Sequence, residues 1–161
     1  MYHIRQVIPQ DLQAVATLES QCFPPAEAAS LASFQYRIAT FPKSFYVAEE
    51  KDSLIGLING CVSDQEHISD NLFEPQGGHT PQGCNQMIFG LATRPERRCQ
   101  GIGAALMNHL IEVARQAGRR HMILTCKQNR IPYYEKFGYV NAGQSVSVHG
   151  GAIWHDMVLP L

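Results

Sequence analysis

A glycine-containing turn at residues 97–106 constrains the fold of this 161-residue chain more than any other segment. It reads Arg-Arg-Cys-Gln-Gly-Ile-Gly-Ala-Ala-Leu, so two glycines, Gly101 and Gly103, closely follow paired arginines. Glycine adopts backbone conformations that other residues avoid, and it leaves room for a ligand to approach. The first turn of a helix presents amide N–H groups without internal partners, at the positive end of the helix dipole. The segment therefore predicts a phosphate-binding helix N-terminus.

The residues on either side of the turn fit this prediction. Apolar residues recur at helical spacing from Ile102 to Ala117, which predicts an amphipathic helix. Gly118 is suited to end that helix, and nearby arginines would place positive charge at its negative end. Residues 87–92 are apolar and predict a buried strand. The expected unit is a strand, a basic glycine turn and a helix.

Three phosphate-binding motifs arrange glycines in a comparable way. A P-loop requires lysine and then serine or threonine after the last glycine, whereas alanine follows Gly103. A dinucleotide fingerprint requires a small residue where this chain has Leu106, and a later acidic residue that is missing here. The pattern Gln/Arg-x-x-Gly-x-Gly/Ala is met by Arg98, Gly101 and Gly103. This pattern resembles the pyrophosphate-binding turn of the GCN5-related N-acetyltransferase (GNAT) superfamily, whose members bind acetyl-coenzyme A (acetyl-CoA).

Length and composition favour one globular domain over residues 1–161. Hydrophobic residues make up 45% and charged residues 17%, which is typical of a protein with a packed core. The net charge of −1 gives no basic excess for nucleic acid, and no 18-residue apolar run or signal peptide is found. We therefore expect neither nucleic acid nor a membrane as partner. Five cysteines without a Cys-x-x-Cys pair indicate reduced thiols in the cytoplasm and no metal site.

Hydrophobic periodicity predicts the element order β-α-α-β-β-β-α-β-α-β-β, which is also the order of the GNAT family. The resemblance implies an α/β (α+β) fold: a central mixed, mostly antiparallel twisted sheet of about seven strands, flanked by about four helices. The longest loop is expected at residues 64–84. The strands are expected at 3–8, 44–49, 54–62, 87–92, 122–126, 139–148 and 152–159, and the helices at 10–22, 26–40, 102–117 and 130–137.

A second segment strengthens the resemblance. Residues 131–139, Ile-Pro-Tyr-Tyr-Glu-Lys-Phe-Gly-Tyr, are similar to a late Tyr-Glu-Lys segment of the superfamily. Softer matches at residues 19–42 and from residue 143 through Trp154 resemble the arylalkylamine (serotonin) N-acetyltransferase branch. This branch implies transfer of an acetyl group from acetyl-CoA to a primary amine, here a small aryl or alkyl amine.

The resemblance also implies site residues. Tyr134 would be the general acid that protonates the leaving thiolate, and the Leu91 N–H would stabilise negative charge on the thioester oxygen. Tyr133 is expected to pack only. Asn129 would either bind the pantetheine or cap a short helix. The acceptor pocket would be formed by Glu19, Phe23 and Pro24. Cofactor-binding residues would be Leu91, Ala92, Thr93, Arg98, Cys99, Gln100, Gly101, Ile102, Gly103, Ala104 and Asn129.

The chain departs from the serotonin branch at the proton acceptor. That branch carries a His-x-His pair before the glycine turn, and the corresponding residues here are Met87 and Phe89, which accept no proton. Glu19 and His79 are candidate bases, although each is also suited to a structural role. A water chain that ends at backbone carbonyls is our preferred account. Cys99, beside two arginines, is either reactive or a bystander.

Other functions stay open at this stage. The same motifs fit a protein or peptide N-terminal acetyltransferase, and four acids at residues 64, 66, 70 and 74 would suit a polyamine acceptor. A CoA-binding module without turnover is a third reading, because the His pair is missing. Trp154 and the last strands offer a contact for a homodimer.

Overall fold

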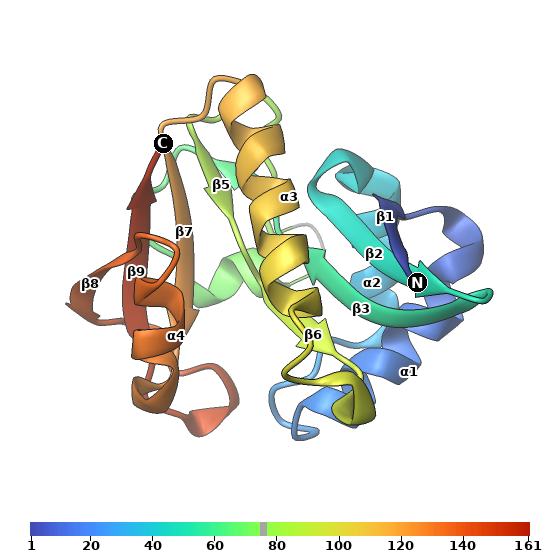
Figure 1. Cartoon of the computed structure of the whole chain (residues 1–161). Coiled ribbons are helices and arrows are strands. Elements are labelled where there is room, and N and C mark those ends of the chain that lie inside the picture. Colours follow the sequence, from blue (N-terminus) through green and yellow to red (C-terminus); the bar gives the residue numbers. More distant parts are fainter. Residues whose placement is uncertain (75–76) are drawn as a thin grey trace.

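Two β-sheets that diverge at one end form the centre of the molecule in the computed structural model, which describes residues 1–74 and 77–161 (Figure 1). The first sheet is antiparallel, in the order β1-β2-β3-β6. The second has the order β4-β5-β7-β9-β8, and only β5 and β7 run parallel. The strands are β1 (His3–Gln6), β2 (Phe45–Glu50), β3 (Ser53–Asn59), β4 (Val62–Ser63), β5 (Asn85–Met87), β6 (Gly90–Thr93), β7 (His121–Cys126), β8 (Val140–Gln144) and β9 (His155–Pro160).

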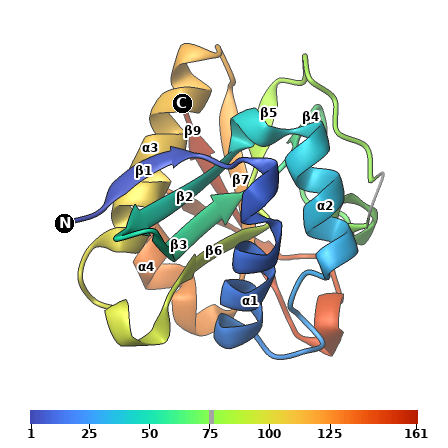
Figure 2. The ribbon, with the colours of Figure 1, turned by 90° about the vertical axis from the view of Figure 1, so that its right-hand side faces the viewer.

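Four α-helices flank these sheets in the described residues: α1 (Leu12–Cys22), α2 (Leu31–Thr40), α3 (Ile102–Gln116) and α4 (Ile131–Glu135). Helices α1 and α2 cover one face of the first sheet, and α3 covers the opposite face (Figure 2). Leu106 and Leu110 of α3 are fully buried against Ile58, whereas Val15 of α1 packs with Leu57. Leu57 and Ile58 are consecutive in β3 and therefore face opposite sides of the sheet, where each packs in a different apolar core.

The fold confirms the expected α/β class and its four helices, and it splits two predicted strands. The expected strand 54–62 divides at Gly60, where an added Cβ would lie 1.8 Å from the carbonyl oxygen of Met87. The expected strand 87–92 divides into β5 and β6, because Ile88 N donates to Ile123 O (2.9 Å) and Phe89 N to Asn59 O (2.7 Å). Successive residues thus bond to different sheets, which is where the sheets part.

Several element boundaries also differ from the sequence prediction. Helix α2 begins at Leu31 instead of residue 26, because the Ser30 hydroxyl accepts the Ser33 N–H at 3.1 Å and caps the helix. The last two strands are shorter than expected. The predicted strands 139–148 and 152–159 leave only residues 149–151 between them. In the structure, ten residues connect β8 and β9. No helix in the described ranges has the length and apolar character that a membrane span requires.

Candidate active site

The glycine turn forms an exposed backbone cradle at the start of α3. Gly101 precedes the helix with φ 83°, and Cys99 also has a positive φ of 62°. A Cβ at Gly101 would have no neighbour within 4 Å, so the turn faces open space. Ala105 N donates to Gly101 O at 2.9 Å, whereas the amides of residues 99–104 donate to no acceptor in residues 1–74 or 77–161. These six N–H groups are free to bind an anion.

The two arginines before the cradle differ in their contacts. The Arg97 guanidinium forms a bidentate pair with Glu50, at 2.7 and 3.2 Å, and its Nε donates to Gln100 Oε1 at 3.0 Å. Arg98 is exposed and lines the cavity beside the cradle. Gln100, predicted to bind the cofactor, is not among the residues that line this cavity. Arg98 is therefore the guanidinium of the turn that is best placed for a phosphate.

Strand β6 presents a backbone edge to the same cavity, where Cys22 Sγ donates to Thr93 O at 3.3 Å. It is the last strand of its sheet and pairs only with β3 in the described chain. Arg94 N donates to Ile55 O at 2.8 Å, and hydrogen-bonding direction alternates along an antiparallel strand. The Ala92 N–H therefore points toward β3, whereas the N–H groups of Leu91 and Thr93 point away from it. This edge suits an extended ligand that carries amide groups.

A cavity of about 770 Å³ lies where β6 and β7 diverge. It runs from the cradle along β6 and the end of β7 to a second region bounded by residues after α1 and before β9. The structure brings together all but one of the predicted site residues along this cavity: Glu19, Phe23, Pro24, Leu91, Ala92, Thr93, Arg98, Cys99, Gly101, Ile102, Gly103, Ala104, Asn129 and Tyr134.

Two tyrosines of α4 lie on the cavity wall with different surroundings. Tyr134 contacts Tyr133 and Tyr139 edge to face, with ring centroids 5.1 and 5.9 Å apart. Burial raises the pKa of the Tyr134 phenol, and the Arg130 charge partly opposes this rise, so the hydroxyl stays protonated at neutral pH. The Tyr133 hydroxyl reaches the cradle, because it lies 3.1 Å from the position of a Cβ at Gly103. Only Tyr134 was predicted to act in the site.

Aromatic side chains enclose the other end of the cavity. Phe73 stacks on His149, with ring centroids 4.6 Å apart and an interplanar angle of 11°, and it also contacts Phe89 at 5.0 Å. Trp154 Nε1 donates to His149 O at 2.8 Å, which places this tryptophan in the cavity wall. Sequence reasoning missed Phe73 and His149, because the loop and the β8–β9 connection meet only in the fold.

Buried charges lie beneath the aromatic end. Glu19 is 4% exposed and Arg37 is 5% exposed, and both line the cavity. Burial raises the pKa of the Glu19 carboxyl, while the Ala29 N–H and the charges of Arg37 and His149 lower it. Burial lowers the pKa of Arg37 to about 10, so it remains a cation at neutral pH. Arg37 was not predicted as a site residue.

The proposed roles of the long loop need correction. His79, a candidate base, does not line the cavity: its Nδ1 accepts the Val62 N–H at 3.1 Å, and its ring packs on Phe41 at 5.1 Å. Of the four acids, Glu74 lines the cavity, whereas two others are used in structural bonds. Asp64 accepts the Cys84 N–H at 2.9 Å, and Asp70 accepts the Ser147 hydroxyl and the Val148 N–H.

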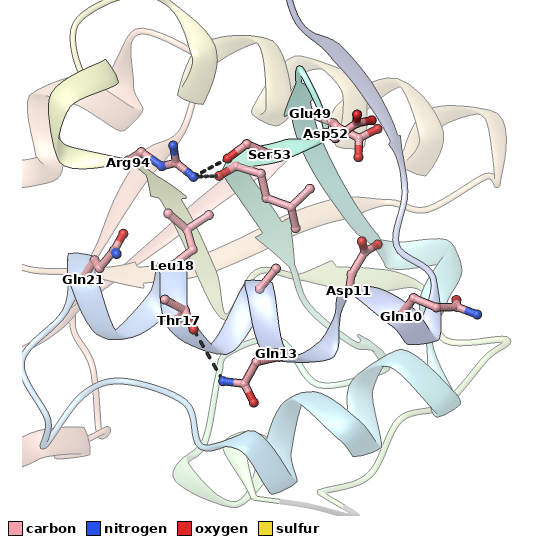
Figure 3. Close-up of a pocket in the computed structure, with 12 residues that line it drawn as sticks. Gln10, Asp11, Gln13, Thr17, Leu18, Gln21, Glu49, Asp52, Ser53 and Arg94 are labelled. Atoms are coloured by element: carbon pink, nitrogen blue, oxygen red, sulfur yellow. Dashed lines mark hydrogen bonds between the residues drawn. The ribbon is translucent and has the colours of Figure 1, made fainter.

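A second groove, of about 510 Å³, lies between α1 and the β2–β3 hairpin (Figure 3). It contains no residue of the cradle. Three of its charged side chains have partners: Arg94 donates to Ser53 Oγ and Leu54 O at 2.7 Å, Asp11 accepts from Arg5 at 2.8 and 3.0 Å, and Glu49 accepts from Arg5 at 3.1 Å. We therefore assign no catalytic or cofactor-binding role to this groove.

Comparisons with known proteins agree with this geometry. The model of the Acetyltransferase (GNAT) family matches residues 12–139. Serotonin N-acetyltransferase of Mesocricetus auratus is 27% identical over 157 residues, which are 95% of this chain and 74% of that protein.

Two solved structures share the fold. The loading GNATL domain of CurA from Lyngbya majuscula superposes with a TM-score of 0.87, at 15% identity over 99% of this chain and 98% of that one. A GNAT family acetyltransferase from Brucella melitensis, in complex with acetyl-CoA, gives a TM-score of 0.64 at 19% identity over 100% of this chain and 88% of that one. The chain belongs to the GNAT acetyltransferase family, whose members transfer an acyl group from acetyl-CoA.

Proposed function

We propose that this protein transfers the acetyl group of acetyl-CoA to the primary amine of a small aryl or alkyl compound, by direct attack of the amine. One observation carries the proposal: a single cavity joins the unpaired amides of residues 99–104 to an aromatic end with a buried carboxylate. The first region suits a pyrophosphate and the second an organic cation. The similarity to serotonin N-acetyltransferase supports the same acceptor class.

The donor would be held at two places. The amides of residues 99–104 and the Arg98 guanidinium would bind the pyrophosphate, because charge-assisted hydrogen bonds are the stronger ones. The outward N–H group of Thr93 would donate to an amide oxygen of the pantetheine arm. Asn129 lines the same part of the cavity and is exposed, so its side chain is free to contact the arm.

Two groups of this chain would assist the reaction. The Leu91 N–H would donate to the acetyl carbonyl oxygen as it gains negative charge, and a well-placed donor of this kind contributes about 3 to 4 kcal/mol. The Tyr134 hydroxyl would give its proton to the departing thiolate. Its raised pKa keeps the phenol protonated until the thiolate forms.

The acceptor end fits a small amine better than an extended peptide. Its walls are Phe23, Phe89, His149 and Trp154, and aromatic faces bind both aryl groups and organic cations. Asp70 joins the long loop to the segment before His149 through two hydrogen bonds. This connection ties the loop that carries Phe73 to the segment that carries His149, and the Glu19 carboxylate would meet the ammonium group.

Release of free CoA thiol from acetyl-CoA tests the proposal. The wild-type protein is assayed with phenylethylamine, butylamine, spermidine and a short peptide, and Tyr134→Phe is assayed in parallel. We expect aryl and alkyl amines to give the highest kcat/KM. Turnover with peptides alone would favour an N-terminal acetyltransferase, and preference for spermidine would favour a polyamine acceptor. Tight CoA binding without thiol release for any acceptor would favour a non-catalytic CoA-binding module.

A further inference from the structure

A buried polar cluster lies beneath Gly90, at the border between the cofactor region and the acceptor region of the cavity. Glu19 comes from α1, Arg37 from α2 and Asn59 from the end of β3, and their exposed fractions are 4%, 5% and 0%. A Cβ placed on Gly90 would lie 3.5 Å from Asn59 Nδ2 and 3.6 Å from Glu19 Oε1. One donor and one acceptor thus face the same small space.

Arg37 fixes the orientation of the Asn59 amide. Its Nη1 donates to Asn59 Oδ1 at 2.9 Å, and a guanidinium has no acceptor atom, so the amide oxygen must face Arg37. The Asn59 NH₂ group therefore points toward Gly90. Glu19 is fixed in a similar way, because its Oε2 accepts the Ala29 N–H at 3.0 Å. This bond leaves Oε1 directed to the space beside Gly90.

Neither of the two facing atoms has a hydrogen-bond partner within residues 1–74 and 77–161. A buried polar atom left unpaired costs about 1–3 kcal/mol, so native proteins rarely keep two together. A water molecule donates and accepts at once, and it would satisfy Glu19 Oε1 and Asn59 Nδ2 together. Glu19 and Gly90 also line the cavity, so the second lone pair of such a water would be able to accept a proton from the acceptor amine.

We propose that Asn59 is a positioning residue that holds a water against Glu19, and that this water relays the proton of the attacking amine to the Glu19 carboxylate. The inference rests on the proposed acetyl transfer. The N–H bond of the acceptor ammonium breaks, the water takes that proton, and it gives one of its own protons to Glu19 Oε1. The water is regenerated and Glu19 becomes a neutral acid, so atoms and charges balance.

The surroundings of Glu19 suit a proton acceptor. Burial raises the pKa of its carboxyl, which brings it closer to the pKa of an amine. The charged or titratable groups that face it are Arg37 from α2, His149 from the β8–β9 connection and Cys22 from α1. The charges of Arg37 and His149 oppose this rise in the pKa of Glu19. The water and Glu19 would provide the proton acceptor that Met87 and Phe89 cannot provide.

Asn59→Asp tests the inference with little change in shape. An aspartate keeps an oxygen for Arg37 but offers no N–H to a water, and its charge raises the pKa of Glu19 further. We expect kcat to fall about 10- to 100-fold, within the range of acid–base catalysis, with the KM for acetyl-CoA unchanged within twofold. The acidic limb of the kcat–pH profile should move to higher pH.

Asn85→Asp is the matched control, because Asn85 is equally buried, donates to Gln65 O at 2.8 Å and does not line the cavity. Its kcat–pH profile should match the wild type. An Asn59→Asp enzyme with wild-type kcat and pH profile would overturn the inference and leave the proposed function intact. Absence of turnover in the wild type would instead count against the proposed function.

A crystal structure of the wild-type protein at high resolution tests the water site without any activity. We expect a water within hydrogen-bond distance of both Glu19 Oε1 and Asn59 Nδ2. Gly90→Ala should exclude this water while the protein folds normally, because the added methyl makes only ordinary van der Waals contacts at 3.5 and 3.6 Å. A wild-type site that holds no water between these two atoms would overturn the inference.

Discussion

Gly103→Val tests ligand approach to the cradle with little effect on helix stability. Gly103 is the second residue of α3, and its backbone lies outside the left-handed region, so valine fits the helix without backbone strain. Valine in a helix is at least as favourable as glycine. The new Cβ would lie 3.1 Å from Tyr133 Oη, the end of a side chain that can shift, and 3.5 Å from Thr93 Oγ1. The free energy of unfolding should stay within about 1 kcal/mol of the wild-type value.

The branched side chain would project into the cavity where the pyrophosphate is proposed to bind, and the turn pattern accepts only glycine or alanine at this position. We expect valine to prevent one or two charge-assisted hydrogen bonds, at about 1.5–3 kcal/mol for each bond. A loss of about 2–3 kcal/mol corresponds to a Kd for CoA that is about 30- to 150-fold higher. Calorimetric titration with CoA measures this change, and pantetheine, which lacks the pyrophosphate, should bind both proteins equally.

Gly118→Ala provides the opposite control at the other end of the helix. Gly118 has φ 77° and open space around its Cβ position, so alanine there is strained by about 1–2 kcal/mol without touching the cavity. Its Tm should fall by a few degrees while CoA affinity stays at the wild-type value. If Gly103→Val binds CoA within twofold of the wild type, the proposed phosphate cradle is wrong.

Two further substitutions test the chemistry of the site. Tyr134→Phe should lower kcat about 100-fold or more, with the Kd of acetyl-CoA changed less than threefold. Single-turnover kinetics measures the chemical step and calorimetry measures acetyl-CoA binding. Unchanged turnover would exclude Tyr134 as the acid. Glu19→Gln should flatten the pH dependence of stability. Burial raises the pKa of Glu19 in the folded protein. The contribution of Glu19 to folding stability is therefore favourable below its pKa in the unfolded chain, and it is lost as pH rises through its pKa in the folded protein. The Tm of Glu19→Gln minus that of the wild type should therefore grow with pH, and a constant difference would contradict the argument.

Local sequence signals predicted the part of the site that is built from neighbouring residues. Helix α3 and the turn before it depend on glycine conformation and on short-range periodicity, so both were predictable. Tyr134 was identified from its motif, and the structure places it on the cavity wall. Its role as general acid stays a prediction.

Features that depend on contacts between distant residues escaped prediction. The division of residues 87–92 into two strands follows from Ile88 and Phe89 bonding to different sheets, which periodicity does not encode. Asn59 and Arg37 lie 22 residues apart and meet only because α2 packs near the end of β3. His79 was chosen for its chemistry, but the fold directs its ring against Phe41. Buried polar groups of this kind are recognised by their unpaired atoms in the structure.

Titration of ¹⁵N-labelled protein with CoA, followed by amide NMR, tests the central claim most directly. The claim is that backbone N–H groups at the start of α3 bind the pyrophosphate of the acetyl donor. We expect saturable shifts at the amides of Gly101, Gly103 and Ala104, with amides of the groove in Figure 3, such as Gln13 and Thr17, unchanged. Shifts confined to that groove, or unchanged amides at the three cradle residues under saturating CoA, would contradict the account.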